Sequence, residues 1–135
     1  MDAIDTQILE MLKKNARESF ATIGKSVELS APAVGNRVKQ LEEKGIIRGY
    51  SLLINHEKLG ITTKAYIILK IHQSSTLRTA YNQIKYLPEV QRCDRITGED
   101  SLCILGYFQD NKDLVNLLER ISQYGVPNTS IILES

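Results

Sequence analysis

The spacing of apolar residues changes near residue 62. Before that point apolar residues recur every three or four positions, which is typical of helices with one buried face. After it, runs in which apolar and polar residues alternate, as in strands, are interleaved with two further helical runs. We therefore predict one domain over residues 1–50, a linker over 51–61 and a second domain over 62–135.

The most informative helical run extends from Ala31 to Lys44. Ser30 precedes it with a hydroxyl that can accept a hydrogen bond from a free backbone N–H, and Pro32 falls in the first turn, where its missing N–H costs nothing. Gly45 supplies the left-handed residue that commonly ends a helix. The apolar stripe consists of Val34, Val38 and Leu41.

A second helix is predicted to begin after Ser19 and to bury Phe20, Ile23 and Val27. Only the residues 27–29 separate it from Ser30. Helix, short turn and helix is the arrangement with which many proteins enter the major groove of DNA. The apolar run in residues 1–14 predicts a third helix that packs across the other two.

Polar and small side chains occupy the side of the 31–44 helix opposite its apolar stripe. The carboxamides of Asn36 and Gln40 suit adenine, while Arg37 or Lys39 suits a phosphate. The alternative is an ordinary solvated helix face. The candidate DNA-binding residues are Ser30, Ala31, Pro32, Asn36, Arg37, Lys39 and Gln40.

The segment after Gly45 is rich in residues that favour strands. Residues 46–54 are predicted to form either a wing or the strand that leads out of the first domain. Asn55 to Gly60 is predicted to be a hinge.

The second domain reads as strand, helix, strand, tight turn, strand, helix and strand. This order predicts an antiparallel sheet with both helices on one face, a ferredoxin-like αβ-sandwich, so the whole chain is α+β. Ser74 or Ser75 is predicted to cap the first helix. The predicted segments are strand 62–72, a helix ended by Pro88, strand 89–97, turn 98–100, strand 101–109, a helix from 110 ended by Gly125, and strand 126–133.

One strand of this sheet is apolar on both sides. Leu102 and Ile104 face one way, and Cys103 and Leu105 face the other. Two helices cover only one side of a sheet. We therefore expect a second subunit to cover the other side, with residues such as Tyr66 and Ile68 at the interface.

Net charge limits how this chain can bind a polyanion. Residues 1–50 contain 8 Lys and Arg against 7 Asp and Glu, and residues 51–135 contain 9 against 9. Because affinity for DNA grows with the number of phosphates neutralised, at least two copies are expected on one duplex. The sequence shows no secretion leader and no apolar run long enough to span a membrane, so a cytoplasmic protein is expected.

Candidate chemistry is sparse. Cys93 and Cys103 lie far from the two histidines and form no metal-ligand pattern, so they are interpreted as buried free thiols. His56 in the hinge and His72 at a strand end are interpreted as surface residues. We therefore predict no catalytic residue, no metal and no cofactor.

Several motifs along the chain together resemble the Lrp/AsnC, or feast/famine, family of transcription regulators. They are Ile4-Asp5, Ile8-Leu9, Asn15-Ala16-Arg17, Leu29-Ser30, Val34, Arg37-Val38, Leu41-Glu42, Gly45-Ile46-Ile47, Gly49-Tyr50 and Thr97-Gly98. The resemblance implies an N-terminal winged helix-turn-helix and a C-terminal sandwich that forms dimers and often tetramers or octamers. It also implies an amino-acid effector bound at contacts between dimers, near Gly98, Glu99, Asp100 and Ser101.

The chain departs from the family pattern at three places. Glu28 stands where the turn usually has glycine. If its backbone is left-handed, a residue other than glycine lowers the stability of the fold by about 1 kcal/mol at this position. Gly35 lies inside the recognition helix, either for close approach to DNA or by simple tolerance. Ser101-Leu102 replaces an aspartate and an aromatic residue.

Three other functions are compatible with a similar double fold. Sirohaem decarboxylases resemble this family and use histidines, but this chain has only two. The second alternative is an architectural DNA binder that needs no ligand. The third is a small-molecule binder or assembly protein that does not bind DNA and keeps the helices only as a scaffold.

Overall fold

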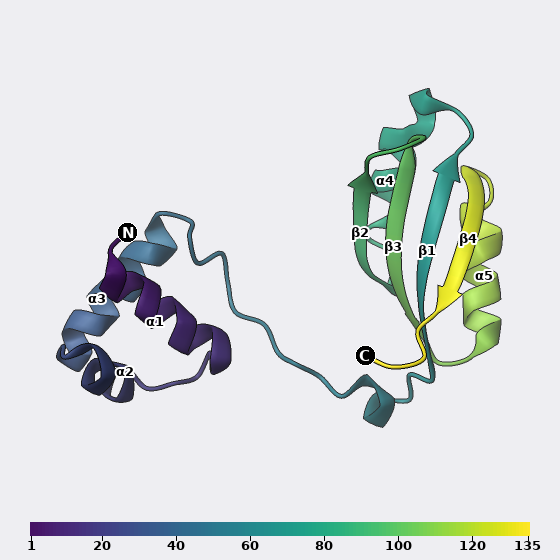
Figure 1. Ribbon diagram of the computed structural model, residues 1–135. Helices are drawn as coiled ribbons and strands as arrows, with labels where there is room; N and C mark the ends of the chain where they lie inside the picture. The colour runs from purple at the N-terminus through teal and green to yellow at the C-terminus, as the bar shows by residue number, and fades with distance from the viewer. The chain divides into compact units, whose positions relative to one another are not determined.

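A computed structural model describes all residues 1–135 of the chain. It divides into two compact units, Met1–Leu53 and Ile54–Ser135, and each is described by itself (Figure 1). None of its helices combines the length and the apolar character needed to cross a bilayer.

The first unit is a bundle of three helices, α1 (Ala3–Lys14), α2 (Phe20–Val27) and α3 (Ala31–Glu43). All three predicted helices are confirmed, with α3 beginning at Ala31 after its Ser30 cap. The bundle buries one apolar stripe from each helix, so packing rather than propensity supplies most of the stability of these helices. The core residues are Ile8, Leu12, Ile23, Val27, Val34 and Val38.

The turn between α2 and α3 depends on a close backbone approach. Glu28 is left-handed, with φ 58° and ψ 44°, as predicted. The Leu29 N–H donates to the Gly24 carbonyl at 2.9 Å. A Cβ atom on Gly24 would lie 2.3 Å from the Leu29 oxygen, so no other residue fits there without moving the turn.

The segment after α3 forms no strand, so the prediction of a wing or strand over residues 46–54 is wrong. Gly45 is left-handed with φ 73°, and the N–H groups of Ile46 and Ile47 both donate to the Leu41 carbonyl. From residue 48 to 54 the backbone makes no backbone hydrogen bond. Strand-forming residues need a partner strand, and the chain provides none here.

The predicted hinge contains a short 3-10 helix, His56–Leu59, which the sequence pattern did not indicate. The Asn55 side chain accepts a hydrogen bond from the Lys58 N–H at its start, and Gly60 ends it with φ 90°. The second unit therefore begins with one turn of helix, ahead of its first strand.

The second unit is an antiparallel four-stranded sheet with the order β2-β3-β1-β4 and with helices on one face (Figure 1). This confirms the α+β fold and the ferredoxin-like sandwich. The elements are β1 (Thr63–Ile71), α4 (Leu77–Ile84), β2 (Val90–Ile96), β3 (Ser101–Phe108), α5 (Asn111–Ile121) and β4 (Gly125–Ile131).

The core of this unit lies between the sheet and the helices. Along β1 every second residue is buried, and Ile67 pairs with Ile104 of β3 in the middle of the buried side. The two helices contribute Leu77, Ala80, Ile84, Leu114, Leu117 and Ile121.

Neither Ser74 nor Ser75 caps α4 as predicted. Residues Ser74–Thr76 form a 3-10 turn, and Thr76, which precedes the helix, makes no capping bond with its side chain. The Ser74 hydroxyl instead donates to the Asp100 carboxylate. A tertiary contact has thus replaced the local cap that sequence spacing favoured.

Candidate nucleic-acid interface

The outward side of α3 carries exposed polar groups. Pro32, Asn36, Lys39 and Gln40 are exposed, and Ala31 is partly buried. Asn36 and Gln40 stand one helical turn apart, and their side chains make no hydrogen bond within the protein, so both carboxamides are free to bond a partner.

Lys39 and Ser30 flank these carboxamides. The Lys39 side chain is 75% exposed, and its ammonium lies 4.0 Å from Glu43, which is a loose contact. The Ser30 hydroxyl accepts a hydrogen bond from the Ala33 N–H at 3.2 Å. Its own hydrogen remains available to a phosphate oxygen beside the helix N-terminus.

Arg37 differs from the other candidates because its side chain is already engaged. It donates to Asp2 at 2.7 Å and to Asp5 at 3.1 Å, and both carboxylates belong to the start of α1. This guanidinium is the main cause that lowers the pKa of Asp2 to about 2. The sequence did not predict this contact, because the partners lie more than thirty positions apart.

Gly35 faces α2 rather than a free surface. A Cβ atom there would lie 3.3 Å from the Phe20 ring, a tight but adjustable contact. Packing against Phe20 is a reason for this glycine that neither sequence-based alternative included.

The predicted effector residues surround the turn between β2 and β3. Gly98, Glu99 and Asp100 all have positive φ, at 89°, 36° and 47°. They are exposed beside a shallow hollow of about 460 Å³, whereas Ser101 is the first residue of β3 and is buried. Three consecutive residues in this conformation give the turn a fixed and unusual shape.

Both acids of the turn already have partners at the end of β1 or just after it. Glu99 forms an ion pair with Lys70 at 2.7 Å, which lowers the pKa of Glu99. Asp100 accepts from the Ser74 hydroxyl, and its carbonyl accepts from the Ile71 N–H at 3.0 Å. A ligand amine at this turn would have to share or replace these contacts.

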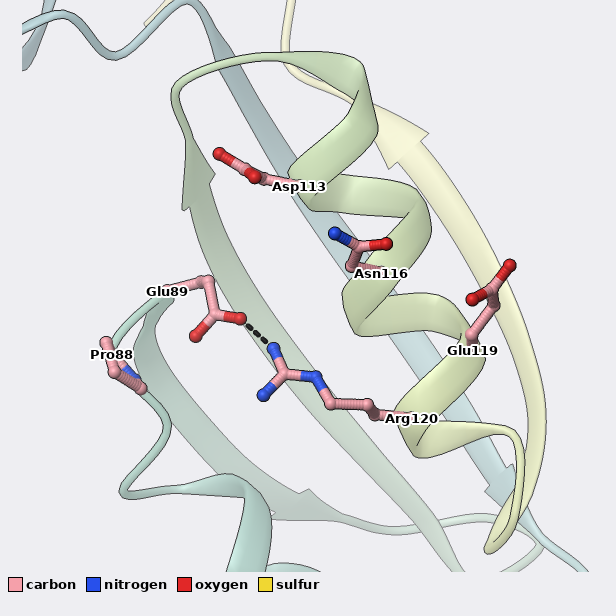
Figure 2. Close-up of a pocket in the computed structure, with 6 residues that line it drawn as sticks. All are labelled: Pro88, Glu89, Asp113, Asn116, Glu119 and Arg120. Carbon is pink, nitrogen blue, oxygen red and sulfur yellow. Dashed lines mark hydrogen bonds and ion pairs between the residues drawn. The ribbon is translucent and has the colours of Figure 1, made fainter.

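Another hollow lies between the start of β2 and α5, with a volume of about 720 Å³ (Figure 2). Arg120 of α5 forms an ion pair with Glu89 across it, while Asp113 and Asn116 extend from α5 on the same side. Sequence reasoning missed this hollow, since Glu89 and Arg120 lie 31 positions apart and neither belongs to a recognisable motif.

The two cysteines lie on the neighbouring strands β2 and β3, and no three His, Cys, Asp or Glu side chains gather into a metal-ligand cluster. His56 packs edge-on against Tyr107, with ring centroids 4.6 Å apart, and His72 is exposed. Cys93 is buried, and burial raises the pKa of its thiol to about 11. Cys103 is only partly buried, which differs from the prediction of two buried thiols.

Comparison with known protein families accounts for nearly the whole chain. Residues 1–42 match the AsnC-type helix-turn-helix domain, and residues 64–135 match the Lrp/AsnC ligand binding domain. The first match contains α1, α2 and nearly all of α3, and the second contains the four-stranded sheet with α4 and α5.

Individual relatives agree with these matches. The transcriptional regulator Ptr1 of Methanocaldococcus jannaschii is 43% identical over 105 residues, which cover 77% of this chain and 70% of Ptr1. The structure of Bacillus subtilis LrpC has a TM-score of 0.89 at 30% identity and covers 100% of this chain and 96% of LrpC.

A third similar structure is the feast or famine regulatory protein Rv3291c of Mycobacterium tuberculosis, complexed with L-methionine. It has a TM-score of 0.92 at 29% identity over 99% of this chain and 92% of Rv3291c. From the two domain matches and these relatives, the chain belongs to the Lrp/AsnC family of transcriptional regulators.

Proposed function

We propose that this regulator recognises its DNA sites through Asn36 and Gln40 of α3. The observation that carries the proposal is that both carboxamides are exposed, one turn apart and without a partner in the protein. A carboxamide can bond N6 and N7 of adenine together in the major groove. The small residues Ala31 and Pro32 at the N-terminal end of α3 let that end enter the groove.

Phosphate contacts position the helix on the duplex. Lys39 supplies an exposed cation that Glu43 contacts only at 4.0 Å, and Ser30 supplies a hydroxyl beside the positive end of α3. Arg37 is the least available of the predicted contacts, since Asp2 and Asp5 hold it.

A second copy of the chain covers the open face of the sheet. Tyr66 and Ile68 of β1 are 48% and 36% exposed on the side away from the helices. Leu52 and Leu53, in the segment without backbone partners, are 80% and 105% exposed. Apolar surface of this extent favours association. The resulting dimer presents two α3 helices to successive major grooves about 34 Å apart, so its sites are roughly palindromic.

An effector of amino-acid type acts at the turn that contains Gly98, Glu99, Asp100 and Ser101. The support is the match to the ligand binding domain and the methionine bound by the similar protein Rv3291c. An α-amino group can take the place of the Lys70 ammonium beside Glu99. The effector changes assembly, and its effect is limited to its differential affinity for the assembly states.

Light scattering with each of the twenty amino acids, together with fluorescence anisotropy on the DNA upstream of the gene, tests the proposal. A change of mass and of DNA affinity with one amino acid is the expected result. DNA binding at a fixed mass would favour the alternative of an architectural, ligand-independent binder. That alternative is supported by the existing partners of Glu99 and Asp100.

Two substitutions on α3 separate base recognition from phosphate contact. Asn36→Ala is expected to relax base preference. Lys39→Ala is expected to weaken binding to all sequences alike and to reduce the salt slope, which is the slope of log K for DNA against log salt concentration, by about 0.9. Equal effects of both substitutions on specific and random DNA would contradict the role of Asn36. No effect of either would indicate that the helices are only a scaffold.

A further inference from the structure

Three charged side chains join the start of α1 to the middle of α3. Nη1 of Arg37 donates to Oδ2 of Asp2 at 2.7 Å and to Oδ1 of Asp5 at 3.1 Å. The side chains of Arg37 and Asp5 are only 29% and 14% exposed. The guanidinium is thus partly withdrawn from water, Asp2 is 55% exposed, and Asn36 and Lys39 of the same helix are exposed.

The backbone of α1 holds the two acids in turn. Oδ1 of Asp2 accepts from the Asp5 N–H at 2.9 Å, and Oδ2 of Asp5 accepts from the Asp2 N–H at 3.1 Å. Each carboxylate therefore uses one oxygen to cap α1 and the other to hold Arg37. Because both acids are fixed to the first turn of α1, the guanidinium has a fixed place relative to that turn.

We propose that Asp2, Asp5 and Arg37 form a positioning cluster that sets the orientation of α3 on α1 and thereby the base preference of α3. The inference rests on the proposed function of α3 in DNA recognition.

The position of Arg37 within α3 explains why it can act in this way. Arg37 directly follows Asn36 and lies three residues before Gln40, so a displacement of its backbone moves both proposed base-contacting residues. The apolar contacts between α1 and α3, such as those of Ile8 and Val34, are non-directional and permit sliding. Charge-assisted hydrogen bonds to two fixed acceptors are directional and therefore oppose such sliding.

Two other roles for Arg37 make different predictions. If Arg37 leaves the acids to contact a phosphate, neutralising the acids should strengthen binding to all DNA. If the cluster only stabilises the fold, neutralising the acids should leave the DNA binding of the folded protein unchanged.

The decisive variant is Asp2→Asn/Asp5→Asn in the full chain. Asparagine caps a helix about as well as aspartate at position 2, and at position 5 its amide oxygen can still accept from the Asp2 N–H, so the variant weakens the ion pairs and keeps the backbone acceptors at the start of α1. The matched control is Glu10→Gln/Glu42→Gln, which removes the same charge from exposed positions of α1 and α3. Both proteins are titrated with a duplex that the native protein selects from a random library, and with a random duplex of equal length.

For a positioning cluster, the ratio of specific to random affinity falls about tenfold in the Asp2→Asn/Asp5→Asn variant, a loss comparable to one wrong base pair. The control keeps its ratio. The salt slope on random DNA is the same in the two proteins. Titrations are made well below the melting temperature of the less stable protein, and Glu28→Gly is added to both if stability must be restored.

Two results would overturn the proposal. Tighter binding of both duplexes than in the control, with a salt slope steeper by about 0.9, would show that the released Arg37 contacts a phosphate. A specificity ratio equal to that of the control would show that the cluster only supports stability.

A measurement without DNA keeps the cluster testable independently of the proposed function. Residual dipolar couplings of the backbone amides give the angle between α1 and α3. This angle is expected to change or to become averaged in Asp2→Asn/Asp5→Asn and to stay native in the control; an unchanged angle would overturn the proposal. If the native protein selects no DNA sequence, the proposed function fails, and the angle still decides the role of the cluster.

Discussion

Glu28 occupies a left-handed backbone conformation that glycine adopts more readily. Its φ and ψ are 58° and 44°, and its exposed side chain makes no hydrogen bond that would offset the strain. We expect Glu28→Gly to stabilise the helical unit by about 1 kcal/mol, which raises Tm by roughly 5 °C. Differential scanning calorimetry measures the change.

The matched control for this prediction is Glu28→Ala. It removes the same charge but keeps a Cβ atom in the left-handed conformation, so no rise in Tm is expected. If both variants melted at the higher temperature, loss of the carboxylate rather than relief of backbone strain would be the cause.

Asp2 provides a pH-dependent part of the stability. Its pKa is about 2 in the folded protein against a usual value of 3.8, chiefly because of Arg37. A lowered carboxyl pKa stabilises the folded state above the usual value, and this contribution disappears as pH falls through the folded value. The difference in unfolding free energy between the native protein and Asp2→Asn should therefore shrink between about pH 4 and pH 2.

Urea unfolding at a series of pH values measures this difference. In an Arg37→Gln background the pH dependence contributed by Asp2 should largely vanish, because its main cause is gone. A difference that stays constant down to pH 2 would contradict the role of the ion pair.

At the scale of elements, the sequence pattern predicted those helix ends and strands that depend only on neighbouring residues. The start of α3 follows from the Ser30 cap, and its end from Gly45. The strands of the second unit follow from alternation, since one side of β1 is fully buried. Where the role of a residue depends on a contact with another part of the chain, the sequence pattern did not predict that role.

Three examples show where the sequence pattern was insufficient. Gly24 looks like a weak residue inside a helix, but the Leu29 carbonyl approaches to within 2.3 Å of where its Cβ would be. Residues 46–54 have strand propensity, yet a strand requires a partner, and none is present in this chain. Arg37 was predicted to contact a phosphate. Its partners, Asp2 and Asp5, lie far away in the sequence, so the pattern gave no indication that they hold its side chain.

We expect self-association to depend on the open face of the sheet. Ile68 pairs with Cys103 on one side and Asn128 on the other, near the middle of this face. An aspartate at position 68 would place an unpaired charge in the interface. Ile68→Asp is expected to lower the molar mass measured by light scattering to that of the monomer.

Val115→Asp is the control for Ile68→Asp. Val115 is 49% exposed on α5, in the helix layer on the other side of the sheet, so its replacement should leave the mass unchanged. Dissociation by Val115→Asp and not by Ile68→Asp would move the interface to the helices.

For the whole molecule, we expect the small net charge and the assembly into dimers together to determine DNA affinity. The chain has a net charge of only +1, so one copy neutralises few phosphates. Since the slope of log K against log salt is about 0.9 per neutralised phosphate, a dimer that presents two α3 helices should have about twice the slope of a monomer. The monomeric Ile68→Asp variant is therefore expected to bind random DNA with half the native slope, and Val115→Asp with the native slope. Anisotropy titrations at several salt concentrations measure both, and an unchanged slope in a proven monomer would mean that each copy binds DNA alone.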